Sequence, residues 1–132
     1  MVKHIIYMKQ EDKKLLLRDL CARLPYGVIV KLNDNFKFNK GDRVLVKELL
    51  DLYCIKELKP YLRPMSSMTE EEKKEFNSLI NGVEERCINA YGKGGYTLAF
   101  TEVNDWLNAH HFDYRGLIEK SLAIEAPEGM YN

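Results

Sequence analysis

The side chains best suited to chemistry lie near the end of the chain, where His110, His111 and Asp113 fall within the segment Asp105–Ile118 (DWLNAHHFDYRGLI). A histidine oriented by a carboxylate can act as a general base toward a serine or cysteine nucleophile. No local motif, such as a nucleophile elbow, places a nucleophile beside these residues. A small enzyme centred on them is therefore an alternative hypothesis, and no catalytic residue is predicted.

Histidines and cysteines can also bind a metal ion, but their spacing here does not favour one. His110 and His111 are adjacent, so their side chains would diverge by about 100° on a helix, and His4 is the only other histidine. The cysteines lie far apart beside core-type residues, which is typical of reduced thiols in a cytosolic protein. They are Cys21, Cys54 and Cys87. Neither a metal ion nor a cofactor is predicted.

A glycine-rich stretch, Gly92–Gly95 (GKGG), has some likeness to a phosphate-binding loop. Such a loop has four residues between its first glycine and a Gly-Lys-Ser/Thr, and it follows a strand and precedes a helix. Here the glycines are expected to follow a helix and precede a strand. We interpret them as a helix C-cap and turn.

Basic and aromatic side chains alternate between residues 31 and 47. Exposed aromatics on a basic sheet can stack the bases of single-stranded nucleic acid. The same pattern also describes an ordinary strand pair whose lysines protect an exposed edge. Nucleic-acid binding is therefore a second hypothesis. Its candidate residues are Lys31, Phe36, Lys37, Phe38, Lys40, Arg43 and Lys47.

Trp106, Tyr114 and Arg115 are of the three residue types that protein interfaces concentrate, so they form a candidate protein interface. A simpler interpretation is that Arg115, like Arg63, anchors its segment to a carboxylate. Asp105 and Asp113 are the carboxylates expected for that role. The simpler, structural interpretation is favoured for the arginines.

The elements that must position these residues begin with a short strand at Val2–Met8. Leucines at spacings of four then predict a helix over Glu11–Leu24, which Pro25 ends because the residue before a proline disfavours helical geometry. Alternating apolar residues predict a strand from Val28 to Leu32. A turn at Asn33–Asn35 leads to a second strand around Phe36 and Phe38.

The middle of the chain is expected to complete an antiparallel meander with strands at Arg43–Lys47 and Leu52–Ile55, although Val44–Leu58 also fits a helix. Lys59–Met68 contains two prolines, which indicates an extended connector. Thr69 and Glu72 form a capping box, which predicts a long helix running to about Tyr91.

The last third is expected to contain a strand at Tyr96–Phe100, a short helix that Thr101 caps, and a second helix that Asp113 caps. The apolar face of the preceding long helix consists of Phe76, Leu79, Ile80, Val83, Cys87 and Ile88. Gly82 lies within that helix and costs it about 1 kcal/mol against alanine, so a break there is an alternative.

The chain of 132 residues is 45% hydrophobic and 11% aromatic, which is typical of one soluble globular domain spanning residues 1–132. Twenty basic residues balance twenty acidic residues, so no global field attracts nucleic acid or a membrane. No secretory signal and no apolar run of about 20 residues is present. The predicted fold class is α+β. It consists of a small antiparallel sheet packed against an N-terminal helix, one long central helix and a C-terminal helical hairpin.

Three blocks of sequence carry a resemblance. They are CARLPYGV (residues 21–28), KPYLRPMSSMTEEEK (59–73) and DWLNAHHFDYRGLIEKSLAIEAPEGMY (105–131). Together they resemble a family of small proteins encoded in gut Bacteroidetes and their phages or prophages. That family has no established activity, so the resemblance implies an origin but no mechanism and no site residue.

These observations favour a phage- or mobile-element-type accessory protein that is not an enzyme and acts by binding another protein in the cytoplasm of a bacterial host. A binder needs only a surface, and the sequence offers surfaces without a reactive constellation. Nucleic-acid binding through residues 31–47 and a small enzyme at His110, His111 and Asp113 remain the alternatives. No membrane partner is expected.

Overall fold

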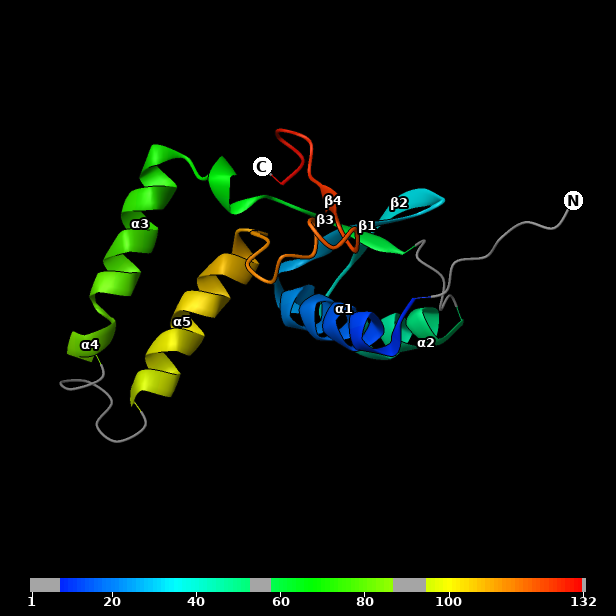
Figure 1. The fold of residues 1–132 in the computed structure, drawn as a ribbon, viewed down its shortest axis with the longest axis horizontal. Helices are drawn as coiled ribbons and strands as arrows, with labels where there is room; N and C mark the ends of the chain where they lie inside the picture. Colours follow the sequence, from blue (N-terminus) through cyan, green and yellow to red (C-terminus); the bar gives the residue numbers. More distant parts are fainter. Residues whose placement is uncertain (1–7, 53–57, 87–94, 132) are drawn as a thin grey trace, which may run out of the picture.

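The computed structural model of the protein describes residues 8–52, 58–86 and 95–131. A mostly antiparallel sheet of order β2-β1-β3-β4 forms the centre of a body, and the helices within residues 70–86 and 95–109 form an arm that projects from it (Figure 1). The strands are β1 (Val28–Leu32), β2 (Asp34–Phe38), β3 (Lys59–Leu62) and β4 (Ile124–Glu125). The α-helices are α1 (Gln10–Arg23), α2 (Arg43–Leu52), α3 (Glu70–Asn81), α4 (Val83–Arg86) and α5 (Gly95–Ala109). The α+β fold class is thus confirmed.

In the N-terminal third, the structure agrees closely with the elements predicted from the sequence. Helix α1 ends at Arg23, and Pro25 lies in the short 3-10 turn Leu24–Tyr26 that follows. Strands β1 and β2 pair as an antiparallel hairpin, and Asn33 occupies the turn with φ of +66°. Asparagine tolerates this left-handed conformation better than most residues. The predicted strand at Val2–Met8 lies outside the described residues, except for Met8, which is buried in the core.

The predicted strand at Arg43–Lys47 is wrong, because these residues begin helix α2. Val46 and Leu50 are buried one helical turn apart, whereas Val44 is exposed. Burial at a spacing of four is helical periodicity, and a short apolar run alone does not separate the two structures. Leu52, where the second predicted strand begins, also belongs to α2, and the rest of that strand lies outside the described residues.

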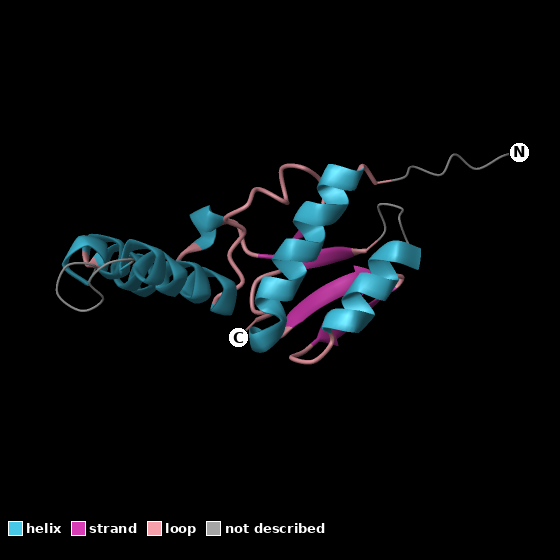
Figure 2. Ribbon diagram, turned by 90° about the horizontal axis from the view of Figure 1, so that it is seen from below, coloured by secondary structure: helices cyan, strands magenta, loops and turns pink. Residues whose placement is uncertain are grey.

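The third strand of the sheet comes instead from the start of the proline-containing connector. Strand β3 pairs antiparallel with β1, and β4 adds to it in parallel (Figure 2). Beyond β3, Arg63 forms a bridge with Phe112, so that the connector is tied to the segment after α5. Helices α1 and α2 cover one face of this sheet (Figure 2).

The capping box at Thr69 is confirmed. The Thr69 hydroxyl accepts from the Glu72 amide at 3.1 Å, and the Glu72 carboxylate accepts from the Thr69 amide at 3.0 Å. Gly82 separates α3 from α4, so the break considered for this position is present. Cys87 and Ile88, on the predicted apolar face, lie outside the described residues.

The predicted strand at Tyr96–Phe100 is also wrong, as is the helix start at Thr101. Both lie within α5, which runs without interruption from Gly95 to Ala109. Val103 and Leu107, one turn apart, are buried against α3 and α4. The predicted glycine turn overlaps residues 92–94, which lie outside the described part of the chain, and Gly95 already belongs to the helix.

No helix follows Asp113 in the described residues up to Tyr131, so the predicted C-terminal helical hairpin is wrong. The hairpin is formed by α3 and α4 with α5, and the residues after Asp113 form turns and strand β4. The predicted role of Asp113 as a helix cap is therefore wrong, but its carboxylate does accept from backbone amides of the turn that follows, those of Leu117 and Ile118, both at 2.9 Å. Gly116 and Ser121 have positive φ angles of 74° and 61°, which interrupt regular helical geometry.

Two hydrophobic clusters stabilise the described structure. The larger cluster joins α1, α2, the sheet and Leu117–Ala123. The smaller cluster joins the helices of the arm and includes Val83, Val103, Leu107 and Phe112. Phe112 is fully buried where the arm meets the body, so the position of the arm depends on the residues around it.

Candidate functional site

A shallow groove lies on the arm between α3 and α5, with a volume of about 590 Å³. The residues lining it are Lys74, Glu75, Ser78, Leu79 and Trp106. The Trp106 ring is half-buried, and its Nε1 donates to Glu75 Oε2 at 3.2 Å. The groove therefore presents one large aromatic side chain that is fixed in place but remains partly accessible.

Trp106 is held in position by three neighbouring rings, of which His110 and Phe112 are stacked on it and Phe76 is tilted. Its ring centroid lies 4.1 Å from that of His110, 5.6 Å from that of Phe76 and 5.8 Å from that of Phe112. The sequence singled out Trp106 as an interface residue, and the structure places it in the groove. An aromatic that is already ordered loses little conformational freedom when a partner binds.

His110 belongs to this stack. Its Nδ1 lies 2.8 Å from the Trp106 carbonyl oxygen, one helical turn earlier. The ring therefore has a packing role and a hydrogen-bonding role at the end of α5.

His111 faces a different environment. It is 8% exposed, has φ of +64°, and stacks on Tyr131 at 3.6 Å between ring centroids. Burial, with positive charge nearby, lowers its pKa to about 4. Its Nδ1 has no hydrogen-bond partner among the described residues. His111 is a neutral packed histidine, and Asp113 is committed to the turn that follows it.

Tyr131 fixes the C-terminal tail to the sheet. Its hydroxyl donates to the Tyr61 carbonyl at 2.6 Å and accepts from the Ile29 amide at 2.9 Å. Burial raises its pKa to about 12, so the hydroxyl stays protonated over the ordinary pH range. The residues predicted as an alternative catalytic centre thus have separate structural roles: His110 packs against Trp106, His111 stacks on Tyr131, and Asp113 binds the amides of a turn.

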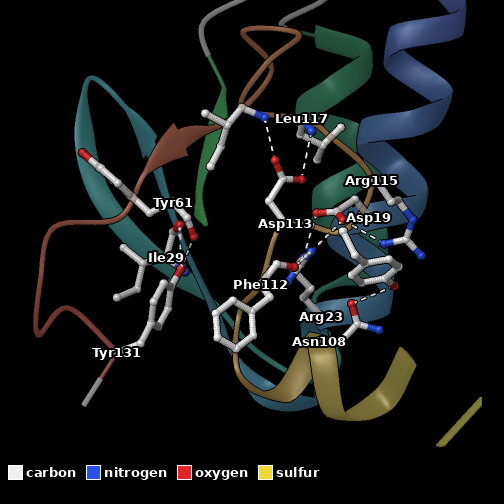
Figure 3. A network of polar contacts seen from close by, with 12 residues as sticks. Asp19, Arg23, Ile29, Tyr61, Asn108, Phe112, Asp113, Arg115, Leu117 and Tyr131 are labelled. Carbon is white, nitrogen blue, oxygen red and sulfur yellow. Dashed lines mark hydrogen bonds and ion pairs between the residues drawn. The ribbon is translucent and has the colours of Figure 1, made fainter. Parts of the chain in front are cut away.

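Tyr114 and Arg115, the other two predicted interface residues, lie in a polar network at the joint between arm and body. Figure 3 shows Arg115 beside Asp19 in this network. Arg115 Nη1 donates to Asp19 Oδ1 at 2.8 Å, and its guanidinium lies over the Tyr114 ring. The Tyr114 hydroxyl donates to Asn108 at 3.0 Å. The structure therefore separates these two residues from the groove that contains Trp106.

Asp19 and Arg23 form the centre of this network and were not anticipated. Arg23 Nε and Nη2 donate to the two Asp19 oxygens at 2.9 and 3.0 Å, and Nη2 also donates to the Phe112 carbonyl at 2.7 Å. Both side chains are fully buried. Their spacing of four on a predicted helix was the available signal, because it permits an ion pair.

Arg63 and Arg115 each anchor their segment to a carboxylate, as the simpler interpretation predicts. The carboxylates are not the Asp105 and Asp113 that the sequence suggested. Arg115 uses Asp19, and Arg63 pairs with both Glu72 oxygens at 2.9 and 2.6 Å. Asp113 is occupied by backbone amides. The Arg63 guanidinium holds the pKa of Glu72 at about 2.

The residues proposed for nucleic-acid binding do not form one surface. Phe38 is fully buried and Phe36 packs against the same core, opposite Val28 and Val30 in the hairpin register. Side chains alternate across a strand, so Lys31 and Lys37 lie on the other face of the sheet. Arg43 and Lys47 are exposed on α2, which covers the face that buries Phe38, and Lys40 is exposed in the turn before α2. Of the two candidate phenylalanines, Phe38 is therefore inaccessible and Phe36 is half-buried on the core face, away from Lys31 and Lys37.

We expect the double substitution Lys37→Glu/Lys40→Glu to leave the affinity for single-stranded oligonucleotides unchanged. Base stacking needs an accessible aromatic face, but Phe38 is buried in the core and Phe36 packs half-buried against it. Fluorescence anisotropy with a labelled oligonucleotide at low salt measures this. A steep loss of affinity in the variant would instead support the nucleic-acid hypothesis.

A second, more enclosed cavity of about 440 Å³ lies between the connector after β3 and the C-terminal tail. Arg63 contributes to its wall, but its guanidinium is already bound to Glu72. Glu125 and Glu128 lie on the opposite wall and are exposed. The cavity offers no convergent set of polar groups that would identify a ligand.

Among the described residues, no group of three or more histidines, cysteines or carboxylates is arranged to bind a metal ion. Cys21 is a free, half-buried thiol, whereas Cys54 and Cys87 lie outside the described ranges. None of the helices in the described part of the chain has the length and apolar character needed to cross a membrane. No protein-family model, no curated protein and no solved structure matches this chain.

Proposed function

We propose that the protein is a non-enzymatic binding protein that recognises another protein through the groove at Trp106. The observation that carries this proposal is the groove itself, which combines a fixed, partly accessible tryptophan with polar neighbours on a projecting helical arm. Tryptophan is among the residues that contribute most to protein interfaces, particularly where it sits in an ordered pocket.

The arm has a shape suited to this role. Helices α3 and α5 lie side by side and extend away from the sheet (Figures 1 and 2). Their shared cluster and the network at Asp19 and Arg115 hold them against the body. A partner can therefore reach the groove without displacing the sheet or its covering helices.

We further propose that the protein acts as an accessory protein of the phage or mobile-element type, in the cytoplasm of a bacterial host. The resemblance of the three sequence blocks to proteins of gut Bacteroidetes and their phages supports this origin. Of the three predicted interface residues, we retain only Trp106 and its groove. Tyr114 and Arg115 make contacts within the protein, at the joint between arm and body.

The test blocks the groove without disturbing the core. Ser78 and Asn77 are adjacent exposed residues on α3, but only Ser78 lines the groove. We expect Ser78→Arg to abolish capture of a host protein that the wild-type chain retains after nuclease treatment. The matched variant Asn77→Arg should capture it normally. Equal capture by both variants would refute the groove as the binding site.

A further inference from the structure

The helices of the arm carry an excess of negative charge that the neutral total conceals. Helices α3, α4 and α5 contain eight acidic residues and three basic residues, whereas the rest of the chain contains twelve acidic and seventeen basic residues. The acidic residues of the arm are Glu70, Glu71, Glu72, Glu75, Glu84, Glu85, Glu102 and Asp105. Such asymmetry within a neutral chain sets the sign of the partner that each part attracts.

Some of this charge is already neutralised within the protein. Glu72 is paired with Arg63, and Glu70 lies 3.2 Å from Lys73. Glu75 lines the groove, accepts from Trp106 and remains exposed. Glu71 is exposed one helical turn before Glu75, and residues four apart lie on the same helix face. Glu75 lines the groove and Glu71 lies one turn before it on α3, so these two carboxylates outnumber Lys74, the one basic residue of the groove lining.

On the basis of the function proposed above, we propose that the partner of this groove is a basic amphipathic helix. Its apolar face would contact Trp106 and Leu79, and its lysines or arginines would pair with Glu71 and Glu75. A helix laid along a groove between two helices is a recurring mode of peptide recognition. Charge complementarity selects a basic helix over an acidic one, because like charges brought together at an interface are repelled.

Synthetic peptides of about four helical turns test this inference. The first has leucines on one helix face and lysines elsewhere, the second replaces every lysine by glutamate, and the third scrambles the first so that the leucines share no face. Trp106 is the only tryptophan of the chain, so its emission reports binding at the groove. Anisotropy of a dye on the peptide measures affinity independently.

We expect the lysine peptide to bind and to change the Trp106 emission, and the other two peptides to bind far more weakly. The substitution Glu71→Gln/Glu75→Gln should weaken binding about fivefold or more, since each surface charge pair contributes modestly. Glutamine keeps an oxygen that can accept from the Trp106 indole. The control Glu70→Gln/Glu119→Gln removes the same charge from exposed positions that do not share the helix face of Glu71 and Glu75, and it should leave the affinity unchanged.

Three results would overturn this inference. They are equal binding of the lysine and glutamate peptides, an equal loss of affinity for the lysine peptide in the two double variants, and no binding of the lysine peptide at all. The Ser78→Arg and Asn77→Arg pair separates that outcome from failure of the proposed function. If Ser78→Arg still abolishes capture while the lysine peptide does not bind, the groove takes a partner that is not basic. If Ser78→Arg has no effect on capture, the proposed function fails as well.

Discussion

Replacing Asp19 by alanine is expected to lower the free energy of unfolding by about 4 kcal/mol, because it leaves a buried charge without its partner. Asp19 and Arg23 are both fully buried, and Arg115 donates to the same carboxylate. An arginine side chain cannot lose its proton to escape this situation. Urea denaturation followed by circular dichroism measures the loss.

A surface ion pair provides the control for this prediction. Lys13 and Asp51 lie 2.6 Å apart, but the Asp51 side chain is 54% exposed. Asp51→Ala should change stability far less than Asp19→Ala, since water replaces the lost partner. Similar losses in the two variants would show that burial does not set the strength of the Asp19 network.

The double variant Asp19→Ala/Arg23→Met adds a second comparison. It replaces the buried pair with apolar side chains, and such replacements are often close to neutral. We expect it to recover much of the stability that Asp19→Ala loses. Arg115 is partly exposed and can be solvated once its partner is removed. If the double variant is as unstable as the single variant, the unpaired Arg23 charge is not the cause of the loss.

The elements that the sequence predicted correctly are those specified by local interactions. Helix α1 follows from leucines spaced by four and from Pro25. The start of α3 follows from the Thr69 capping box. The β1–β2 hairpin follows from alternation around Asn33. In each case the residues that determine the element lie within it or next to it.

The predictions that were wrong concern short apolar runs, whose secondary structure the local sequence does not determine. Residues 43–47 and 96–100 are rich in β-branched or aromatic side chains, which suits a strand. In the structure they lie in α2 and α5, whose apolar residues one turn apart are buried against other helices or the sheet. Packing of a helical face overrode local propensity at residues 43–47, where Val46 is buried.

The candidate site could be predicted only in part for the same reason. The identity of Trp106 indicated an interface, but its groove requires α3, which contributes Glu75, 31 positions earlier in the chain. The pairing of Arg115 with Asp19 spans 96 positions, and that of Tyr131 with Ile29 spans 102. Contacts of this range arise from the fold, and no local spacing specifies them.

Lowering the pH from about 6.5 to about 4 is expected to reduce the stability of the protein through His111. The folded pKa of His111 is about 4, below its ordinary value of 6.5, so the unfolded chain takes up a proton first. The stabilising effect is complete above the unfolded pKa and is lost as the pH falls, by up to about 3 kcal/mol. Arg23, Arg63, His110 and Lys37 provide the surrounding positive charge that opposes protonation.

Glu72 contributes in a lower pH range. Its folded pKa of about 2 lies below the ordinary 4.5, so its stabilising effect is lost only as the pH falls below about 4.5. Unfolding curves at a series of pH values therefore separate the two groups. Glu72→Gln should reduce the dependence of stability on pH below about 4.5 and keep the part between 6.5 and 4.

The variant His111→Asn tests whether His111 causes the loss of stability between pH 6.5 and pH 4. Asparagine tolerates the positive φ of 64° at this position and does not titrate in this range. It lacks the ring that stacks on Tyr131, so the variant should be less stable at neutral pH. Its stability should nevertheless change little between pH 6.5 and 4. A slope as steep as that of the wild-type protein would assign the pH dependence to other groups, and His111 would then stabilise the tail by packing alone.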